Sequence, residues 1–271
     1  MNLQVNGQRS FCYTGGKPFD AAKPTVVFIH GVLNDHSVWI LQSRWFAHHG
    51  WNVLALDLPG HCKSAGAPSA SVEEAARFVL ALLDAAGVEH AALVGHSFGS
   101  LIALEVAASA PQRVTHLAMV GTAYPMAVSP ALLDGALNDP QRAIARVNVL
   151  SHSTLAPPPS SLGPGTWLRG ASRALMRRVL ASNRETNVFH AGFKACDSYA
   201  NGEAAMAQVR CPVLFLLGAV DQMTPPRATR ALRDKAPHVR VVTVPAGHAL
   251  MSEAPDAVMF ALRDFLDGAP A

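Results

Sequence analysis

The residues most able to do chemistry lie in the stretch "LVGHSFGS" at 93–100. Gly95 and Gly99 flank Ser97 there in the pattern GxSxG, which is typical of a nucleophilic serine on a tight turn. The pattern arises by chance in roughly one chain in ten of this composition. The elements around Ser97 must therefore decide whether it is a nucleophile.

A serine hydroxyl is a weak nucleophile near neutral pH and needs a neighbouring base that is itself oriented by a carboxylate. Asp221 follows the apolar run "VLFLLG", and His248 follows "VVTV". We expect both residues in loops at the carboxyl ends of strands, and such loops share one crevice in an open parallel sheet. The sequence therefore predicts a triad of Ser97, Asp221 and His248.

Short, continuous apolar runs predict strands that are covered on both faces. They lie at 25–29, 52–57, 91–95, 116–121, 212–218 and 239–244. Helical patterns separate them, and the clearest begins at Ser71, which is a good helix cap with Glu74 three residues later. This alternation predicts a doubly wound, mostly parallel α/β sheet, with Ser97 at a bend between a strand and the N-terminus of a helix.

Two segments depart from this alternation. Leu3 to Tyr13 alternate around Asn6-Gly7, which predicts an N-terminal β-hairpin with a type I′ turn. From 124 to 201, helical patterns and a proline-rich loop at 151–165 replace the strands. We expect a core made of residues 1–123 and 202–271, with an inserted small helical cap at 124–201.

Composition narrows the class of protein. The chain has 271 residues, 50% of them hydrophobic, which suits one sizeable domain with an insertion. Charged residues make up only 15% and the net charge is +3, so nucleic acid is not expected as a partner. No membrane-spanning run or signal-like start is evident, and we expect a cytoplasmic protein.

The four cysteines are scattered at positions 12, 62, 196 and 211, without CxxC pairs or Cys/His runs at zinc spacing. This spacing indicates neither a metal site nor a disulfide framework. Serine-based acyl transfer also requires no metal and no organic cofactor. We therefore expect none of these groups in the protein.

Five motifs in order make the chain resemble the α/β-hydrolase superfamily over nearly its full length. They are "HG" at 30–31, "DLPGH" at 57–61, GxSxG at 95–99, "GAVDQMTP" at 218–225 and "GH" at 247–248. The resemblance, to small-cap serine hydrolases of the carboxylesterase type, implies that the backbone N–H groups of Val32 and Phe98 form an oxyanion hole. A departure is Cys62-Lys63, where relatives commonly carry glycine and arginine.

Other polar residues of these motifs favour structural roles. His30 and His61 are interpreted as packed, hydrogen-bonded loop residues rather than as catalytic ones. His96 is expected to shape the pocket, and Asp57 to brace its loop. For Cys62 an inert side chain is favoured over a reactive thiol, because no activating charge is evident nearby.

The predicted cap is basic, with eight Lys and Arg against four Asp and Glu. Arg169, Arg173 and Arg177 recur every four residues and so share one helix face. A solvated face is the favoured interpretation, and an acidic carrier protein that docks there is the sharper alternative. Whether Trp167, Leu168, Met176 and Phe189 line the acyl site or fill the cap core stays open.

These features predict a serine hydrolase that cleaves carboxylic esters through an acyl-enzyme. The serine argues against haloalkane dehalogenases and epoxide hydrolases, which use an aspartate at this position. Hydrolases of C–C bonds, perhydrolases, thioesterases and esterases of acyl-carrier-protein esters share the same triad and stay open as alternatives. A non-catalytic ligand receptor of this fold is a further alternative.

Overall fold

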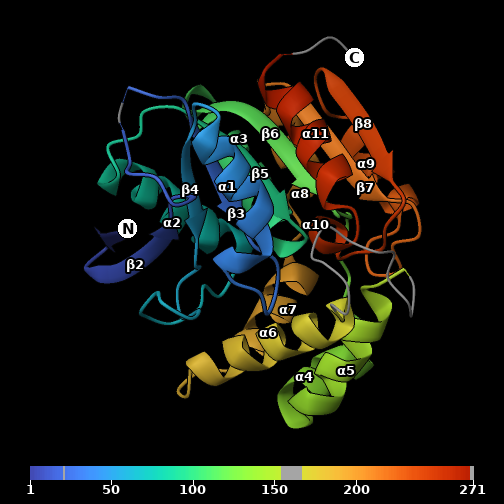
Figure 1. The fold of residues 1–271 in the computed structure, drawn as a ribbon. Coiled ribbons are helices and arrows are strands. Elements are labelled where there is room, and N and C mark those ends of the chain that lie inside the picture. The colour runs from blue at the N-terminus through green and yellow to red at the C-terminus, as the bar shows by residue number, and fades with distance from the viewer. Residues whose placement is uncertain (21, 154–166, 269–271) are drawn as a thin grey trace.

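The computed structural model describes residues 1–20, 22–153 and 167–268 (Figure 1). Its centre is an eight-stranded sheet in the order β1-β2-β4-β3-β5-β6-β7-β8. The strands are β1 Asn2–Val5, β2 Gln8–Tyr13, β3 Thr25–Ile29, β4 Asn52–Leu56, β5 Ala91–His96, β6 Val114–Val120, β7 Val213–Gly218 and β8 Val239–Val244. Strands β3 to β8 pair in parallel, which confirms the predicted mostly parallel α/β sheet.

The N-terminal hairpin is formed by β1 and β2, as predicted. Asn6 and Gly7 occupy its turn with φ values of 51° and 77°, a left-handed conformation that asparagine and glycine tolerate well. Strand β2 then pairs antiparallel with β4, with Cys12 opposite Leu56. The hairpin thus extends one edge of the parallel sheet.

Helices cover both faces of the sheet, which explains the continuous apolar character of the inner strands. Every residue of β3, β4, β5 and β7 is buried. One face packs against α2 (Val72–Ala85), α3 (Phe98–Ser109) and α8 (Gly202–Gln208). The other packs against η1 (His36–Trp39), α1 (Ile40–His48), α10 (Leu250–Glu253) and α11 (Pro255–Leu266). The remaining short helices are η2 (Pro111–Arg113), η3 (Pro226–Thr229) and α9 (Arg230–Arg233).

Helix α2 shows how the sequence sets its boundary. The hydroxyl of Ser71 accepts a hydrogen bond from the backbone N–H of Glu74 at 3.2 Å, and the Glu74 carboxylate accepts one from the N–H of Ala70 at 2.8 Å. The first bond satisfies an N–H group that the first turn of a helix leaves free, and the second ties the residue before the cap to the same turn. The helix therefore begins where the cap motif predicted.

Between β6 and α8 the described residues form four helices: α4 (Pro130–Asn138), α5 (Pro140–Leu150), α6 (Leu168–Ser182) and α7 (Val188–Ser198). In Figure 1 they form a group on one side of the sheet, away from α11 and the C-terminus. They share a hydrophobic cluster that includes Ile144, Val179 and Phe189. Of the loop predicted at 151–165, residues 154–165 lie outside the described residues. The division at 124–201 remains our proposal for the cap.

In the part of the chain that the structure describes, no helix combines the length and the apolar character needed to cross a membrane.

Candidate active site

Ser97 lies between the last residue of β5 and the first residue of α3. Its backbone adopts φ 52° and ψ −120°, a conformation that costs a non-glycine residue about 1–3 kcal/mol. The N–H of Ser97 donates to the carbonyl of Val120 on β6 at 3.0 Å, which helps to hold the turn. The sequence predicted this bend, and the structure shows that its strain falls on the serine.

Gly95 and Gly99 are required by close packing around this turn. A Cβ atom on Gly95 would lie 2.1 Å from the carbonyl oxygen of Gly99, and one on Gly99 would lie 2.4 Å from that of Ile29. Both neighbours are backbone atoms, so no side chain can rotate away. Only glycine at these positions lets α3 start so close to β5 and β3.

Asp221 and His248 come from the loops after β7 and β8, and the structure brings them together. The Nδ1 atom of His248 lies 2.9 Å from Oδ2 of Asp221. The other oxygen of Asp221 accepts hydrogen bonds from the backbone N–H groups of Met223 and Thr224, each at 2.8 Å. Burial alone would raise the pKa of Asp221, but the charge of His248 and these hydrogen bonds outweigh burial and lower it. Asp221 is therefore ionised near neutral pH.

Thr224 is a member of the site that sequence reasoning missed. Its hydroxyl donates to Oδ2 of Asp221 at 2.7 Å and lies 3.0 Å from Nδ1 of His248. The Asp221 carboxylate and the Thr224 hydroxyl oxygen can both accept a hydrogen bond from Nδ1. They therefore favour the tautomer with a proton on that nitrogen, which leaves Nε2 free to act as a base. The only signal in the sequence was a threonine three residues after Asp221, a spacing typical of local turns.

His96 holds the backbone of the His248 loop. Its Nε2 lies 2.9 Å from the carbonyl oxygen of His248, and the two rings are 4.6 Å apart. Burial and the neighbouring charge of His248 lower the pKa of His96 to about 3. Because the imidazole is neutral, Nε2 carries the proton that it donates to this carbonyl.

Glu253, in α10, is a second residue that the sequence did not reveal. One carboxylate oxygen accepts from the N–H of Gly247 at 2.6 Å, and the other accepts from the N–H and the hydroxyl of Ser153, each at 2.7 Å. The N–H of Ala249 also donates to the carbonyl of Ser151 at 2.8 Å. Buried Glu253 thus ties residues 151–153 to the loop that carries His248.

Val32 and Phe98, the residues expected to form an oxyanion hole, lie next to Ser97 in different ways. Phe98 follows it directly as the first residue of α3, and Val32 follows Gly31, whose added Cβ would lie 3.1 Å from the Cβ of Ser97. Among the described residues, neither the N–H of Val32 nor that of Phe98 has a hydrogen-bond acceptor. Within the part of the chain that the structure describes, both N–H groups are therefore available to an acceptor.

The described residues include no hydrogen bond between the hydroxyl of Ser97 and His248. Catalytic hydrogen bonds are often long without a ligand and tighten when substrate is bound. His96 and His248 line a cavity of about 510 Å³, a volume suited to a small-molecule ligand. Ser97 follows His96 directly, although it is not itself among the lining residues.

The structure decides, for each of the four cap residues left open by the sequence, whether it lines the cavity. Leu168 and Met176 of α6 line it, and Met176 also belongs to the cap cluster. Trp167 is exposed, and Phe189 is fully buried in that cluster away from the described lining. Helix α6 therefore contributes the cap wall of the cavity.

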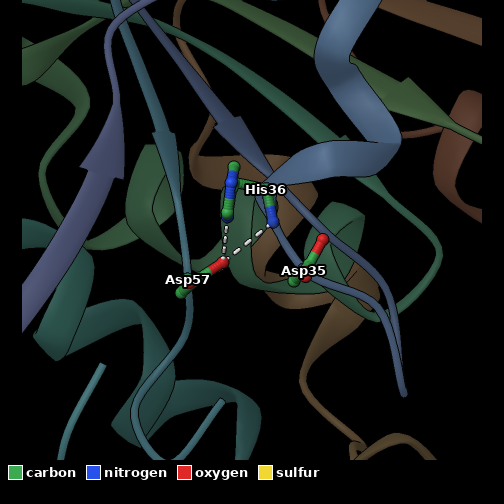
Figure 2. Close-up of side chains that lie close together, drawn as sticks. All are labelled: Asp35, His36 and Asp57. Carbon is green, nitrogen blue, oxygen red and sulfur yellow. Dashed lines mark hydrogen bonds and ion pairs between the residues drawn. The ribbon is translucent and has the colours of Figure 1, made fainter. Parts of the chain in front are cut away.

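Asp35, His36 and Asp57 form the one group in the described residues with metal-ligand geometry (Figure 2). Asp57 accepts from the N–H of His36 at 2.9 Å, from its Nδ1 at 2.7 Å and from the N–H of Lys63 at 3.1 Å. Asp35 accepts from Ser37 and from two further side chains. A cation would have to displace these donors, so the group fits loop bracing better than metal binding, and Asp57 braces its loop as expected.

The histidines of the neighbouring loops are also engaged. His30 lies with Nε2 3.1 Å from the N–H of Leu58 and with Nδ1 2.8 Å from the carbonyl of Gly31. His61 lies 2.9 Å from the carbonyl of Pro59 through Nδ1, and burial lowers its pKa to about 4. Both rings are buried and neutral near pH 7, which agrees with structural roles.

Cys62 is held in its thiol form. Its Sγ donates to Asp35 at 3.3 Å, and burial together with the charge of Asp35 raises its pKa to about 12. A thiol with so little thiolate at neutral pH is a poor nucleophile. The surroundings of Cys62 therefore favour the thiol over the thiolate, in line with an inert side chain.

The arginines on α6 are partly engaged within the cap. The Arg173 guanidinium lies 5.3 Å from the centre of the Trp167 ring, and Nε of Arg177 donates to Gln141 at 2.8 Å. Arg177 is exposed, whereas Arg169 and Arg173 are half-buried. The three do not form a uniformly exposed stripe.

Comparison with known proteins agrees with this fold. Residues 24–255 match the model of the alpha/beta hydrolase fold family, and the chain belongs to that family, whose named relatives include hydrolases and esterases. One relative is the dihydrolipoyllysine-residue acetyltransferase component of the acetoin cleaving system of Pseudomonas putida, at 30% identity. The match covers 89% of this chain but only 63% of that protein's length.

Two further proteins match over nearly their whole length. The pimeloyl-(acyl-carrier protein) methyl ester esterase of Pectobacterium atrosepticum is 28% identical, over 88% of this chain and 92% of its own. The crystal structure of the enol-lactonase from Burkholderia xenovorans superposes with a TM-score of 0.82 at 22% identity, covering 98% of this chain and all of the other. At that identity the superposition shows a shared fold.

Proposed function

We propose that this protein is a serine hydrolase that cleaves carboxylic esters through an acyl-enzyme intermediate. The observation that carries the proposal is the paired Asp221 and His248, with His248 on the wall of a cavity beside the strained turn of Ser97. The name of the methyl ester esterase among its relatives supports the choice of esters.

In the first half-reaction, the hydroxyl of Ser97 attacks the ester carbonyl while Nε2 of His248 takes its proton. The N–H groups of Val32 and Phe98 bind the oxyanion, and in well-studied enzymes one such donor contributes about 3–4 kcal/mol. His248 then returns the proton to the leaving alcohol, while ionised Asp221 stabilises the imidazolium. A water molecule activated by His248 releases the acid in the second half-reaction.

The test combines covalent labelling with turnover. The wild-type protein is expected to react with a fluorophosphonate probe and to hydrolyse p-nitrophenyl acetate and butyrate, and Ser97→Ala is expected to abolish both. Folded protein that neither labels nor turns over would refute the proposal and favour a ligand receptor. Full activity in Ser97→Ala would refute Ser97 as the nucleophile.

The acidic carrier protein remains a second proposal, as a partner that carries the substrate. It is supported by the exposed Arg177 and by the name of the carrier-protein methyl ester esterase. Charge reversal at Arg169, Arg173 and Arg177 is expected to slow turnover of acyl-carrier-protein esters and to spare small esters. Equal turnover of acyl-carrier-protein esters by the wild type and the charge-reversed variant would refute this docking surface.

A further inference from the structure

The cavity beside His248 is mostly apolar and has one permanently charged side chain. Its walls come from the segment before and within α1, from α6 and from the loop around His248. Among the described lining residues, Arg178 of α6 is the one Lys or Arg, and no Asp or Glu lines the cavity. A cation at one place in an apolar cavity suggests a ligand with an acidic group at a defined distance from the reacting bond.

Arg178 is anchored along one edge of its guanidinium. Its Nη2 donates to Oδ2 of buried Asp35 at 2.8 Å and lies 3.4 Å from the hydroxyl of Ser37. Asp35 is fixed in turn, because its other oxygen accepts from the N–H of Ser37 at 2.8 Å. An arginine held in this way loses little further freedom when it binds a second acceptor.

The free edge of Arg178 can bind such an acceptor. A guanidinium carries five N–H donors, and the hydrogen bonds of Arg178 to Asp35 and to Ser37 both come from Nη2, which leaves donors on Nε and Nη1 for a ligand. The side chain is 61% exposed, so a ligand can reach it from the cavity mouth. Carboxylates match the fork geometry of guanidinium N–H groups through two parallel hydrogen bonds.

We propose that Arg178 binds a carboxylate at the far end of the substrate's acyl chain, so that the cavity selects half-esters of dicarboxylic acids. This inference rests on the proposed esterase activity and names its substrate class. The apolar residues of α6, among them Leu168 and Leu175, cover the methylene chain between the two ends. The ester end lies beside His96 and His248, next to Ser97.

A purely structural role for Arg178 predicts a different outcome. Helix α6 and the residue after it already contact the core through Ser182, which accepts from the N–H of Cys62 at 3.0 Å, and through Asn183, which donates to Gly60 at 3.2 Å. If Arg178 only added a third tie through Asp35, its loss would affect neutral and acidic esters alike. Discrimination between the two substrates therefore separates the two roles.

The experiment compares p-nitrophenyl butyrate with the mono-p-nitrophenyl esters of succinate, glutarate and adipate. Arg178→Gln is expected to lower kcat/KM for the best half-ester by about tenfold or more relative to butyrate, mainly through KM. Arg178→Lys keeps the charge but loses the paired N–H donors of the guanidinium, and its kcat/KM for the half-ester is expected to lie between those of the wild type and Arg178→Gln. Arg142→Gln is the matched control, because Arg142 is an exposed cap arginine outside the described cavity lining, and its substrate preference is expected to be unchanged.

If Arg178→Gln lowered kcat/KM equally for p-nitrophenyl butyrate and for every half-ester, the inference would be overturned. It would also be overturned if Arg142→Gln lowered kcat/KM for the half-esters as much as Arg178→Gln does. Binding of glutarate and butyrate to Ser97→Ala protein, measured by calorimetry, tests the site without turnover. Tighter binding of glutarate that disappears in the Ser97→Ala, Arg178→Gln double variant supports the inference even if the proposed activity fails. Turnover of butyrate without any such preference would refute the inference alone.

Discussion

Replacing Asp221 with asparagine tests the proposed mechanism most directly, because the change removes a charge and little volume. In the wild-type protein, Oδ2 of Asp221 lies 2.9 Å from Nδ1 of His248 and fixes the proton on that nitrogen. The amide oxygen of asparagine can keep the two backbone donors at Met223 and Thr224, so its NH₂ group then faces Nδ1. Two donors cannot pair, and the imidazole is expected to turn to the tautomer protonated at Nε2.

A histidine with its proton on Nε2 cannot accept one from Ser97. In a serine protease the equivalent aspartate-to-asparagine change lowers kcat by about 10⁴-fold, or about 5.5 kcal/mol of transition-state stabilisation. We expect a loss of this order here, with KM nearly unchanged because Asp221 does not line the cavity. The assay is hydrolysis of p-nitrophenyl butyrate, together with the rate of fluorophosphonate labelling.

Thr224 supplies a second arm of the same test. Its hydroxyl lies 3.0 Å from Nδ1 and can accept a hydrogen bond from an Nδ1 proton when Asp221 is changed, so part of the imidazole keeps the active tautomer. The double variant Asp221→Asn, Thr224→Val is therefore expected to lose more activity than Asp221→Asn alone. A loss of less than about tenfold in Asp221→Asn, with the protein folded, would refute the assigned role of this carboxylate.

Three further predictions concern the scaffold of the site. Gly95→Ala is expected to lower the free energy of unfolding by about 2–3 kcal/mol or more in urea denaturation, because the new methyl group would meet the Gly99 carbonyl at 2.1 Å; a neutral effect would contradict the packing argument. Glu253→Gln leaves one N–H donor facing an amide donor, so it is expected to lower the free energy of unfolding by about 1.5–3 kcal/mol and to lower kcat. Thermal unfolding and p-nitrophenyl butyrate hydrolysis measure these effects, and unchanged values would contradict the prediction. Unfolding free energy is also expected to fall by about 2 kcal/mol per histidine between about pH 6.5 and pH 5 for His61 and His96, and a flat profile would contradict their burial in the neutral form.

The sign of that pH effect follows from where the protons bind. In the folded protein the pKa is about 4 for His61 and about 3 for His96, below the ordinary value of 6.5. The unfolded chain therefore binds these protons first as the pH falls, and protonation favours unfolding. The stability is fully present above pH 6.5 and is lost as the pH approaches the folded values. His61→Asn is expected to remove about half of the loss.

Sequence reasoning predicted the elements whose cause is local. Asn6-Gly7 specified the hairpin turn, Ser71 and Glu74 specified the start of α2, and continuous apolar runs specified the buried strands. The same reasoning placed Asp221 and His248 in loops at strand ends, because parallel topology brings such loops together. These predictions depended on periodicity and turn chemistry, which can be read within a few residues.

The residues that sequence reasoning missed act through contacts between distant segments. Thr224 and Glu253 carry no periodic signal, and each is identified only by the donors and acceptors that folding brings to it. Glu253 joins residues 151–153 to Gly247, two segments separated by about a third of the chain. A buried acid in such a place is recognised by its saturated hydrogen bonds, and these exist only in the folded structure.

In the cap, too, tertiary packing decides what the sequence pattern leaves open. The sequence left open whether Met176 and Phe189 line the acyl site or fill the cap core, whereas in the structure Met176 lines the cavity and Phe189 packs within the cap. The difference comes from how α6 and α7 are placed against the core: Gly192 of α7 approaches Val32 so closely that an added Cβ would lie 3.0 Å from its side chain. Helix α7 thus packs on the proposed oxyanion turn, and α6 is the cap helix that lines the cavity in the described part of the chain. Changes of substrate preference are therefore expected from substitutions on α6, whereas substitutions at Gly192 are expected to lower turnover of all esters together.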